Sequence, residues 1–398
     1  MINEIKVAAA RELETLIKVR RHLHRHPELS FKEFETSRFL IAQLKAMEID
    51  KIKQIDRTGI LATVEGTSSG KTILLRADMD ALPISEQNQT GYESINPGVM
   101  HACGHDAHMA CLLVATKILN QLKDQWAGTI KVLFQPAEER IPGGAQLMIK
   151  NGVLEHAKPS SVIGQHVIPS LPAGKVGFRP GEFMASMDEI YLIVKGKGGH
   201  AAMPETTIDP VLIASHIIVA SQQLISRNNS PKTPSVLSFG KITGLGATNI
   251  IPDEVKIEGT FRTLDETWRF KALTQFTKMV KSIAESMGGT CEVEILNGYP
   301  HLHNEKTLTE RLKAQAAVYL GKNNVVTPDI WMAAEDFAYY AQLVPSSFYL
   351  LGVQNKERGI DSGLHTPTFD LDEKALETGA GLMAWLAVGE LNAAFNTF

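Results

Sequence analysis

The segment at residues 101–108, HACGHDAH, places a thiol and an imidazole two residues apart. Cys103 and His105 flank Gly104, and this loop spacing lets both side chains turn toward one point. Thiolate and imidazole are good Zn²⁺ ligands, and carboxylate is a common third ligand. An isolated pattern of this kind is more typical of a small buried cysteine beside surface histidines. Because we expect carboxylates at the same place, we favour a metal site, whereas Cys111 is predicted to lie in the core.

Two adjacent carboxylates, Glu138 and Glu139, follow an apolar run at residues 129–134 and Pro136. A solvated helix start would explain such a pair, because proline is common in the first turn of a helix. The pair follows a strand that we expect to be buried, however, and solvation is poor there. Neighbouring side chains point in different directions, so one carboxylate can bind a metal while the other acts as a base. Metal-assisted hydrolysis needs both functions.

Polar side chains also follow two further apolar runs. The run at residues 71–77 leads into Asp78 and Asp80, and the run at residues 161–164 leads into His166. Ligands bind outside the carboxyl ends of the strands in open α/β sheets. We therefore expect these side chains to share one edge of a sheet with the paired glutamates.

His365 is a further candidate for this edge. It lies in a loop, GLHTPTF, after an apolar run at residues 346–352. That position can bring the imidazole to the same edge, although an ordinary loop histidine explains the sequence equally well.

The chain shows two alternating patterns of secondary structure. Up to residue 183, apolar runs alternate with helical stretches at residues 107–123 and 144–152, which predicts a mostly parallel sheet. Residues 184–297 follow the order β-α-β-β-α-β of the ferredoxin-like unit. The first pattern then returns, with helices predicted at 308–320 and 372–395. The inserted unit's segments are predicted at residues 189–195, 209–225, 235–242, 254–262, 266–287 and 290–296.

The predicted fold class is therefore α/β. A catalytic domain of residues 1–183 and 298–398 has a mostly parallel sheet flanked by helices. It is interrupted by an inserted ferredoxin-like α+β domain of residues 184–297.

Composition excludes several classes of protein. The 398 residues are 44% hydrophobic and 21% charged, as in ordinary globular proteins. A net charge of -4 indicates no nucleic-acid or anionic-membrane surface. No apolar run approaches the roughly 18 residues of a membrane span, and residues 1–19 suit a helix rather than a targeting peptide. Three cysteines are too few for a disulfide scaffold, which favours a reducing, cytoplasmic location.

Other patterns in the sequence are weaker indications of function. The glycines of GKGG at residues 196–199 lack the spacing of a dinucleotide fingerprint, and neither a G-x-S-x-G motif nor a P-loop occurs. The basic run RRHLHRH at residues 20–26 precedes Pro27, and we expect it to be a solvated helix end.

Ten ordered motifs match a known family. They are RRHLHRHPELSFKE, LLRADMDALPI, MHACGHDAH, FQPAEE, GQHV, GKGGHAAMP, TNIIP, GTFRT, AAEDFAYY and GLHTPTFD. Through them the chain resembles the two-metal amidohydrolases of the aminoacylase and carboxypeptidase clan. The similar branch contains hippurate hydrolases, N-acyl-amino-acid amidohydrolases, N-acetyl-diaminopimelate deacetylases and plant auxin-conjugate hydrolases. The resemblance implies a catalytic domain with an inserted lid domain that commonly dimerises, and hence a homodimer or dimer-based homo-oligomer.

The resemblance also implies roles for individual residues. Glu138 is the general base, and Asp78 matches an acid that orients a metal-binding histidine. Arg76 stands where the wider clan has a histidine ligand, which leaves open which ion each ligand serves. Two divalent ions per subunit are implied, Zn or Mn, with Co or Ni as alternatives, and Cys103 bridges them. The implied metal ligands are Cys103, His105, Glu139, His166 and His365.

In the inserted domain, His200 matches a residue that reaches into the partner subunit's site and stabilises the oxyanion. Asn249 and Arg262 match residues that hold the substrate's carboxylate, which a guanidinium binds well. Without the resemblance, Arg262 would be taken as an exposed charge at a strand end. The branch often has a histidine where this chain has Glu205, which leaves the preferred acyl group or side chain open.

We therefore expect a cytoplasmic, metal-dependent hydrolase of the amide bond in N-acyl amino acids, with no nucleic-acid or membrane partner. A short-peptide aminopeptidase or carboxypeptidase of the same clan is an alternative. Two others are a metal-independent cysteine amidase that uses Cys103 and a non-catalytic binding protein.

Overall fold

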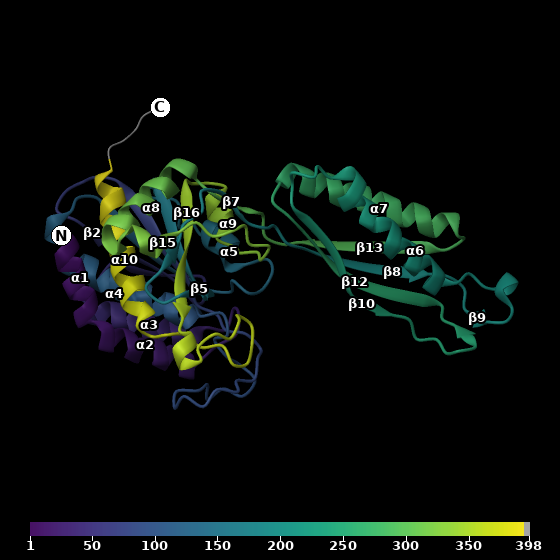
Figure 1. The fold of residues 1–398 in the computed structure, drawn as a ribbon, viewed down its shortest axis with the longest axis horizontal. Coiled ribbons are helices and arrows are strands. Elements are labelled where there is room, and N and C mark those ends of the chain that lie inside the picture. Colours follow the sequence, from purple (N-terminus) through teal and green to yellow (C-terminus); the bar gives the residue numbers. More distant parts are fainter. Residues whose placement is uncertain (394–398) are drawn as a thin grey trace. The chain divides into compact units, whose positions relative to one another are not determined.

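The computed structural model describes residues 1–393, which form two compact units (Figure 1). The first unit comprises Met1–Gly181, His303–Asp329 and the chain from Asp336 onward. The inserted unit comprises Glu182–Leu302 and, in addition, the short segment Ile330–Glu335. The end of the helix predicted at 372–395, and of the domain predicted to reach 398, lies outside the described residues.

The sheet of the first unit has the strand order β1-β2-β4-β3-β5-β16-β6-β15. Its four central strands are parallel, as the sequence predicts, whereas β1, β2 and β6 each pair with a neighbour in antiparallel fashion. The central strands are β4 (Thr129–Gln135), β3 (Thr72–Asp78), β5 (Ser161–Pro172) and β16 (Ser346–Gln354). The flanking strands are β1 (Ile52–Ile55), β2 (Gly59–Glu65), β6 (Val176–Gly177) and β15 (Val325–Val326).

The central strands form because their apolar runs are covered on both faces. Every residue of β3 is buried, as is typical of a strand inside a parallel sheet. β5 is longer than the run predicted at residues 161–164, because the chain continues to pair with β16 beyond that run. As a result His166 lies inside the strand rather than after its end.

Helices cover the sheet of the first unit. Figure 1 shows α1, α4 and α10 on one side of β5 and β16, and α5 and α9 on the other. The apolar residues of α1, α2, α4 and α10 belong to one core with those of the sheet. The helices are α1 (Ile2–Arg11), α2 (Leu13–Arg25), α3 (Phe34–Ala46), α4 (His105–Gln121), α5 (Gly144–Lys150), α8 (Lys306–Leu320), α9 (Ala338–Ala341) and α10 (Ala375–Asn392).

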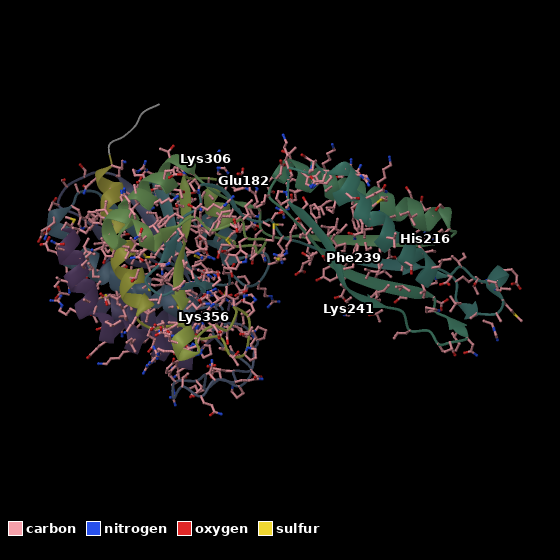
Figure 2. All side chains as sticks on the ribbon, in the orientation of Figure 1. Glu182, His216, Phe239, Lys241, Lys306 and Lys356 are labelled. Atoms are coloured by element: carbon pink, nitrogen blue, oxygen red, sulfur yellow. The ribbon has the colours of Figure 1, made fainter. Side chains whose placement is uncertain are left out.

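The inserted unit has the predicted ferredoxin-like topology. Its antiparallel strands are in the order β10-β12-β8-β13, and α6 and α7 pack with them around a separate core. On the edge strand β10, Phe239 packs against this core while Lys241 is exposed (Figure 2). The elements are β8 (Asp188–Lys195), α6 (Pro210–Gln223), β10 (Ser235–Thr243), β12 (Glu254–Thr263), α7 (Glu266–Ser286) and β13 (Thr290–Asn297).

Local sequence signals set the helix ends in this unit. The carboxylate of Asp209 accepts hydrogen bonds from the amides of Val211 and Leu212 at the start of α6, which is the ordinary role of an N-cap. Asp265 caps α7 in the same way. Within the described residues, no helix combines the length and the apolar character needed to cross a membrane.

Candidate active site

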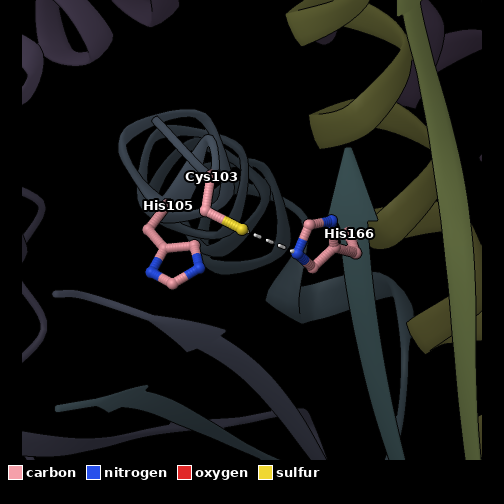
Figure 3. Close-up of side chains that lie close together, drawn as sticks. All are labelled: Cys103, His105 and His166. Atoms are coloured by element: carbon pink, nitrogen blue, oxygen red, sulfur yellow. Dashed lines mark hydrogen bonds between the residues drawn. The ribbon is translucent and has the colours of Figure 1, made fainter. Parts of the chain in front are cut away.

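Gly104 lets two side chains approach the strand β5. Its φ is +84°, and a Cβ atom at this position would lie 2.3 Å from Cγ2 of Val167. Glycine adopts such a conformation at low cost and brings no side chain into the contact. Cys103 and His105 can therefore lie on either side of it, and the Cys103 Sγ is 3.5 Å from Nε2 of His166 (Figure 3).

Backbone carbonyls orient both of these histidine rings. Nδ1 of His105 lies 2.8 Å from the carbonyl oxygen of Asp80, and Nδ1 of His166 lies 2.6 Å from that of Val167. A carbonyl oxygen only accepts, so each Nδ1 carries a hydrogen and donates it. When the ring is neutral, its lone pair is on Nε2. Histidines that bind metals are commonly held in this way.

Glu139 and His365 form a second group around the same thiol. Nε2 of His365 lies 3.3 Å from Sγ of Cys103 and 3.3 Å from Oε1 of Glu139. The backbone amide of His365 donates to the carbonyl of Ala102 at 2.8 Å, which ties its loop to the cysteine segment. Cys103 is therefore shared by two donor groups. In each group the ligand atoms lie within 4.8 Å of one another: Cys103, His105 and His166 in one, and Cys103, Glu139 and His365 in the other.

The electrostatics of these residues fit a divalent cation. Nε2 of His105 and Oε1 of Glu139 are buried and lie 3.9 Å apart, and among the described residues neither atom forms a hydrogen bond of normal geometry. Burial, together with the charges of Glu139, Glu138 and Asp78, raises the pKa of the Cys103 thiol well above its usual range. A thiolate at this position therefore needs a nearby positive charge, which a metal ion can supply.

Glu138 lies beside the ligand atoms without belonging to the two groups that share Cys103. A carboxylate oxygen of Glu138, a carboxylate oxygen of Glu139 and an imidazole nitrogen of His105 all lie within 4.8 Å of one another. Glu138 is 6% exposed, so little water competes for its carboxylate. This position, next to the donors and largely buried, suits a base.

Comparisons with known proteins agree with this arrangement. A model of the peptidase family M20/M25/M40 matches residues 74–388. The chain belongs to this family. The chain is 40% identical over 361 residues to an N-acetyl-L-cysteine deacetylase of Bacillus subtilis, which covers 91% of this chain and 84% of that one. It is 38% identical over 383 residues to thermostable carboxypeptidase 1 of Saccharolobus solfataricus, with 95% and 96% covered.

A solved structure shows the same fold over nearly the whole chain. It is a dinuclear metal-binding peptidase of the M20 family from Bacillus subtilis, with a TM-score of 0.82 and 34% sequence identity, and 98% of this chain and 100% of that chain are covered. The predicted family and the predicted class of enzyme, a metal-dependent hydrolase of amide bonds, are confirmed.

In this M20-family chain, the carboxylate of Asp78 contacts a second histidine, His108. Oδ1 of Asp78 lies 2.6 Å from Nδ1 of His108, and Nε2 of His108 accepts a hydrogen bond from the amide of Val167 at 2.9 Å. Both ring nitrogens of His108 are therefore in use, and it has no lone pair for a metal. Burial would raise the pKa of Asp78, but His105, Arg76 and His108 outweigh it and hold that pKa well below its usual range.

Arg76 is buried in a hydrogen-bond network. Its guanidinium donates to Asp78 at 2.5 Å, to Gln135 at 3.0 Å and to Asp336 at 2.7 Å. The carboxylates on both sides account for the burial of this charge, because a buried ion needs paired partners. Arg76 therefore fixes Asp78 and Asp336 and is not a metal donor.

The structure places His200 and Asn249 side by side in the inserted unit. His200 lies in β9 (Gly199–His200), which pairs with β11 (Ile250–Ile251), and the carbonyl of Asn249 accepts from the amide of Ala201 at 3.1 Å. Both side chains are exposed. Nδ1 of His200 lies 3.1 Å from the amide of Ala202 and accepts its hydrogen bond, so the neutral ring carries its proton on Nε2.

Arg262 lies elsewhere in the same unit. It stands near the end of β12, where Phe261 pairs with Asp188 and where the guanidinium donates to the carbonyl of Met332 at 3.1 Å. The structure therefore does not bring Arg262 and Asn249 of one chain together.

The prediction of a solvated helix end at residues 20–26 is wrong for Arg20 and His24. Both are buried, and both contact Oδ2 of Asp106 at 2.8 Å. His24 also lies 3.1 Å from Glu86. Asp106 directly follows His105 in the chain, so this network anchors the start of α4. Sequence reasoning missed this network, because no local pattern pairs residue 106 with residues 20 and 24.

Proposed function

We propose that this M20-family chain is a metal-dependent amidohydrolase that cleaves N-acyl amino acids into a carboxylate and a free amino acid. The observation that carries the proposal is the Cys103 thiol, which two donor groups share, with Glu138 beside them. The similarity to an N-acetyl-L-cysteine deacetylase supports a small N-acyl amino acid as the substrate. We place the enzyme in the cytoplasm, which suits three free cysteines.

We infer two divalent ions per subunit, which Cys103, His105, His166, Glu139 and His365 would hold. The mixed sulfur, nitrogen and oxygen donors favour Zn²⁺, while Mn²⁺, Co²⁺ or Ni²⁺ remain alternatives that metal analysis separates. The solved dinuclear relative supports the number of ions. When bound, such ions lower the pKa of water and polarise the amide carbonyl.

Glu138 supplies the proton transfers in this proposal. Its carboxylate accepts a proton from water as the water attacks the acyl carbon, and it returns this proton to the nitrogen of the leaving amino acid. Because Glu138 is nearly buried, the proton is not lost to bulk solvent between the two steps. Asp78 takes no proton itself, since it acts by holding His108 and Arg76.

His200 is the proposed donor to the oxyanion. The amide of Ala202 occupies its Nδ1, which leaves Nε2–H free to donate. A preorganised donor of this kind stabilises the negative charge that develops on the acyl oxygen. We propose that the inserted unit is a lid and dimerisation domain that brings His200 and Asn249 to the partner subunit's site, where that subunit's own Arg262 binds the substrate's carboxylate.

A short-peptide carboxypeptidase is the second candidate, because a carboxypeptidase is among the similar proteins. The two activities share the site and differ in what is attached to the scissile amide. A metal-independent cysteine amidase is disfavoured, because the raised pKa of Cys103 keeps its thiol protonated without a cation. A non-catalytic binding protein would not need the base at Glu138.

A substrate panel tests the proposal. Acetyl, benzoyl and indole-acetyl amino acids are assayed beside dipeptides with free amino groups, each with Zn²⁺, Mn²⁺ or Co²⁺ and after EDTA. We expect hydrolysis of N-acyl amino acids that EDTA stops and metal restores. Faster hydrolysis of the dipeptides would favour the peptidase. Hydrolysis that EDTA leaves unchanged would reject the metal-dependent mechanism.

A further inference from the structure

We propose that Glu33 and Asp80 are positioning residues, two buried carboxylates that hold the backbone at residues 137–139 and so set the directions of Glu138 and Glu139. The inference rests on the proposed roles of those two glutamates as base and metal ligand.

Three consecutive backbone amides donate to these two carboxylates. The amide of Ala137 donates to Oε1 of Glu33 at 2.9 Å. The amides of Glu138 and Glu139 donate to Oδ1 and Oδ2 of Asp80 at 2.9 and 3.0 Å. Each oxygen of Asp80 thus holds one of the two glutamates. Neighbouring residues present their side chains in different directions, so this clamp determines which glutamate faces which neighbour.

The clamp acts on an irregular piece of backbone. Ala137 has a φ of 54°, which is uncommon for a residue with a side chain. A conformation of this kind persists only where its surroundings hold it. Glu33 supplies that support through the Ala137 amide, immediately before the two functional glutamates.

Asp80 also contacts a third functional residue. Its backbone carbonyl accepts the hydrogen bond from Nδ1 of His105 at 2.8 Å, and the hydroxyl of Ser30 donates to its Oδ2 at 2.6 Å. A shift of Asp80 therefore moves Glu138, Glu139 and His105 together.

Glu33 is anchored away from the site. Besides Ala137, its carboxylate accepts from the amide of Phe31 at 2.9 Å and from the hydroxyl of Thr58 at 3.0 Å. Both Glu33 and Asp80 are fully or almost fully buried, and hydrogen-bond donors use the oxygens of both. Neither therefore serves as a metal ligand. Burial and the nearby Asp80 raise the pKa of Glu33 to about 7, so a neutral side chain of the same shape is compatible with its position.

This chemistry predicts that the two conservative amide variants differ. In Glu33→Gln, one oxygen still accepts from Ala137 and Phe31, and the new amide group can donate to the Thr58 hydroxyl. In Asp80→Asn, the side chain keeps only one oxygen as an acceptor for two backbone amides. The backbone amide of either Glu138 or Glu139 therefore loses its acceptor and faces the NH2 group of the new side chain, which is itself a donor.

The experiment compares Asp80→Asn, Glu33→Gln and Glu33→Ala with Glu390→Gln, a buried carboxylate on α10 that pairs with Arg311. Metal affinity of the full chain is measured with a chromophoric chelator, and kcat, KM and the thermal midpoint are measured for the metal-loaded enzyme. We expect Asp80→Asn to lose about 10- to 100-fold in metal affinity and in kcat with KM nearly unchanged, as for other residues that orient ligands. Glu33→Gln should stay within a few-fold of wild type, and Glu33→Ala should lose kcat.

Three results would overturn the inference. The first is wild-type metal affinity and kcat in folded Asp80→Asn. The second is equal loss in Glu33→Gln and Glu33→Ala, which would mean that charge rather than hydrogen bonding matters. The third is equal loss of affinity in Glu390→Gln, which would indicate general destabilisation. Metal affinity is read without turnover, so a wild-type enzyme inactive on N-acyl amino acids would refute the proposed function while the affinities still test the clamp.

Discussion

His200 and Arg262 lie at opposite ends of the inserted unit. His200 pairs with Ile250 just before β12 begins at Glu254, and Arg262 is the last residue but one of that strand. At about 3.4 Å per residue, the two ends of β12 are roughly 25–30 Å apart. One small N-acyl amino acid cannot contact both side chains of the same unit. If both residues serve one substrate, they must come from different subunits.

Complementation tests this arrangement. His200→Ala and Glu138→Gln should each be nearly inactive alone. After subunit exchange, half of the dimers are mixed, and one of the two sites in each mixed dimer has an intact Glu138 and the partner's intact histidine. We expect activity to recover to about a quarter of wild type in a two-fold dimer with independent sites.

A matched control uses Arg262→Ala in place of His200→Ala. Arg262 is proposed to act in its own subunit, so mixing this variant with Glu138→Gln leaves every mixed site with one defect and should restore nothing. Equal recovery in both mixtures would contradict the assignment of Arg262. If mass or labelling shows exchange and neither mixture recovers, His200 does not act across subunits.

Glu138→Gln keeps the size of the side chain and removes the base. We expect kcat to fall by about 10² to 10⁴, the usual range for acid–base catalysis, with unchanged metal content. Metal analysis and steady-state kinetics measure both quantities. Loss of metal would mean that Glu138 rather than Glu139 is the ligand, and near-normal turnover would remove Glu138 from the mechanism.

Cys103 should be shielded while metal is bound. Because a coordinated thiolate is less available to electrophiles, alkylation at Cys103 is expected to be slow in the metal-loaded enzyme and faster after chelation at alkaline pH. Cys103→Ser should lower metal content. Cys111 and Cys291 are buried away from the donors and serve as internal references in mass spectrometry. Equal alkylation rates at Cys103 with and without metal would contradict its role as a ligand.

The buried His24 should make stability depend on pH. Burial and the charge of Arg20 lower the pKa of His24, but Asp106 and Glu86 outweigh them and raise it above its ordinary value. The stabilisation is therefore complete below the unfolded-state pKa of about 6.5 and is lost as pH rises through the folded-state pKa. His24→Gln should cost about 1.5–3 kcal/mol at pH 6, the range for a hydrogen bond to a charged group, and less at pH 9. Denaturation of both proteins across this range measures the difference, and a pH-independent gap would contradict the role of His24.

The sequence predicted the fold well where local patterns decide the outcome. The β-α-β-β-α-β order of the inserted unit follows from periodicity and from end signals such as Asp209 and Asp265. The sequence was less informative where contacts between residues far apart in the chain decide the structure. β5 continues past its apolar run because β16 lies beside it, and Arg20 and His24 are buried because Asp106 faces them.

The candidate site shows the same division. The types and spacing of Cys103, His105 and the 138–139 pair indicated metal chemistry. The sequence could not identify the groups that orient the candidate ligands, because two of these groups are the backbone carbonyls of Asp80 and Val167. Glu33 lies more than one hundred residues before the backbone that it holds, and no local pattern connects the two.

The interrupted order of the first unit bears on how the chain is made. β16, at residues 346–354, lies inside the sheet between β5 and β6, and His365 comes later still. A ribosome releases nearly all of the inserted unit as one continuous stretch before β16 exists. The inserted unit can therefore fold during synthesis, whereas the sheet of the first unit cannot be completed before β16 has been synthesised. If His365 is a ligand as proposed, the donor set stays incomplete until residue 365 has emerged, and full metal affinity cannot arise before that point.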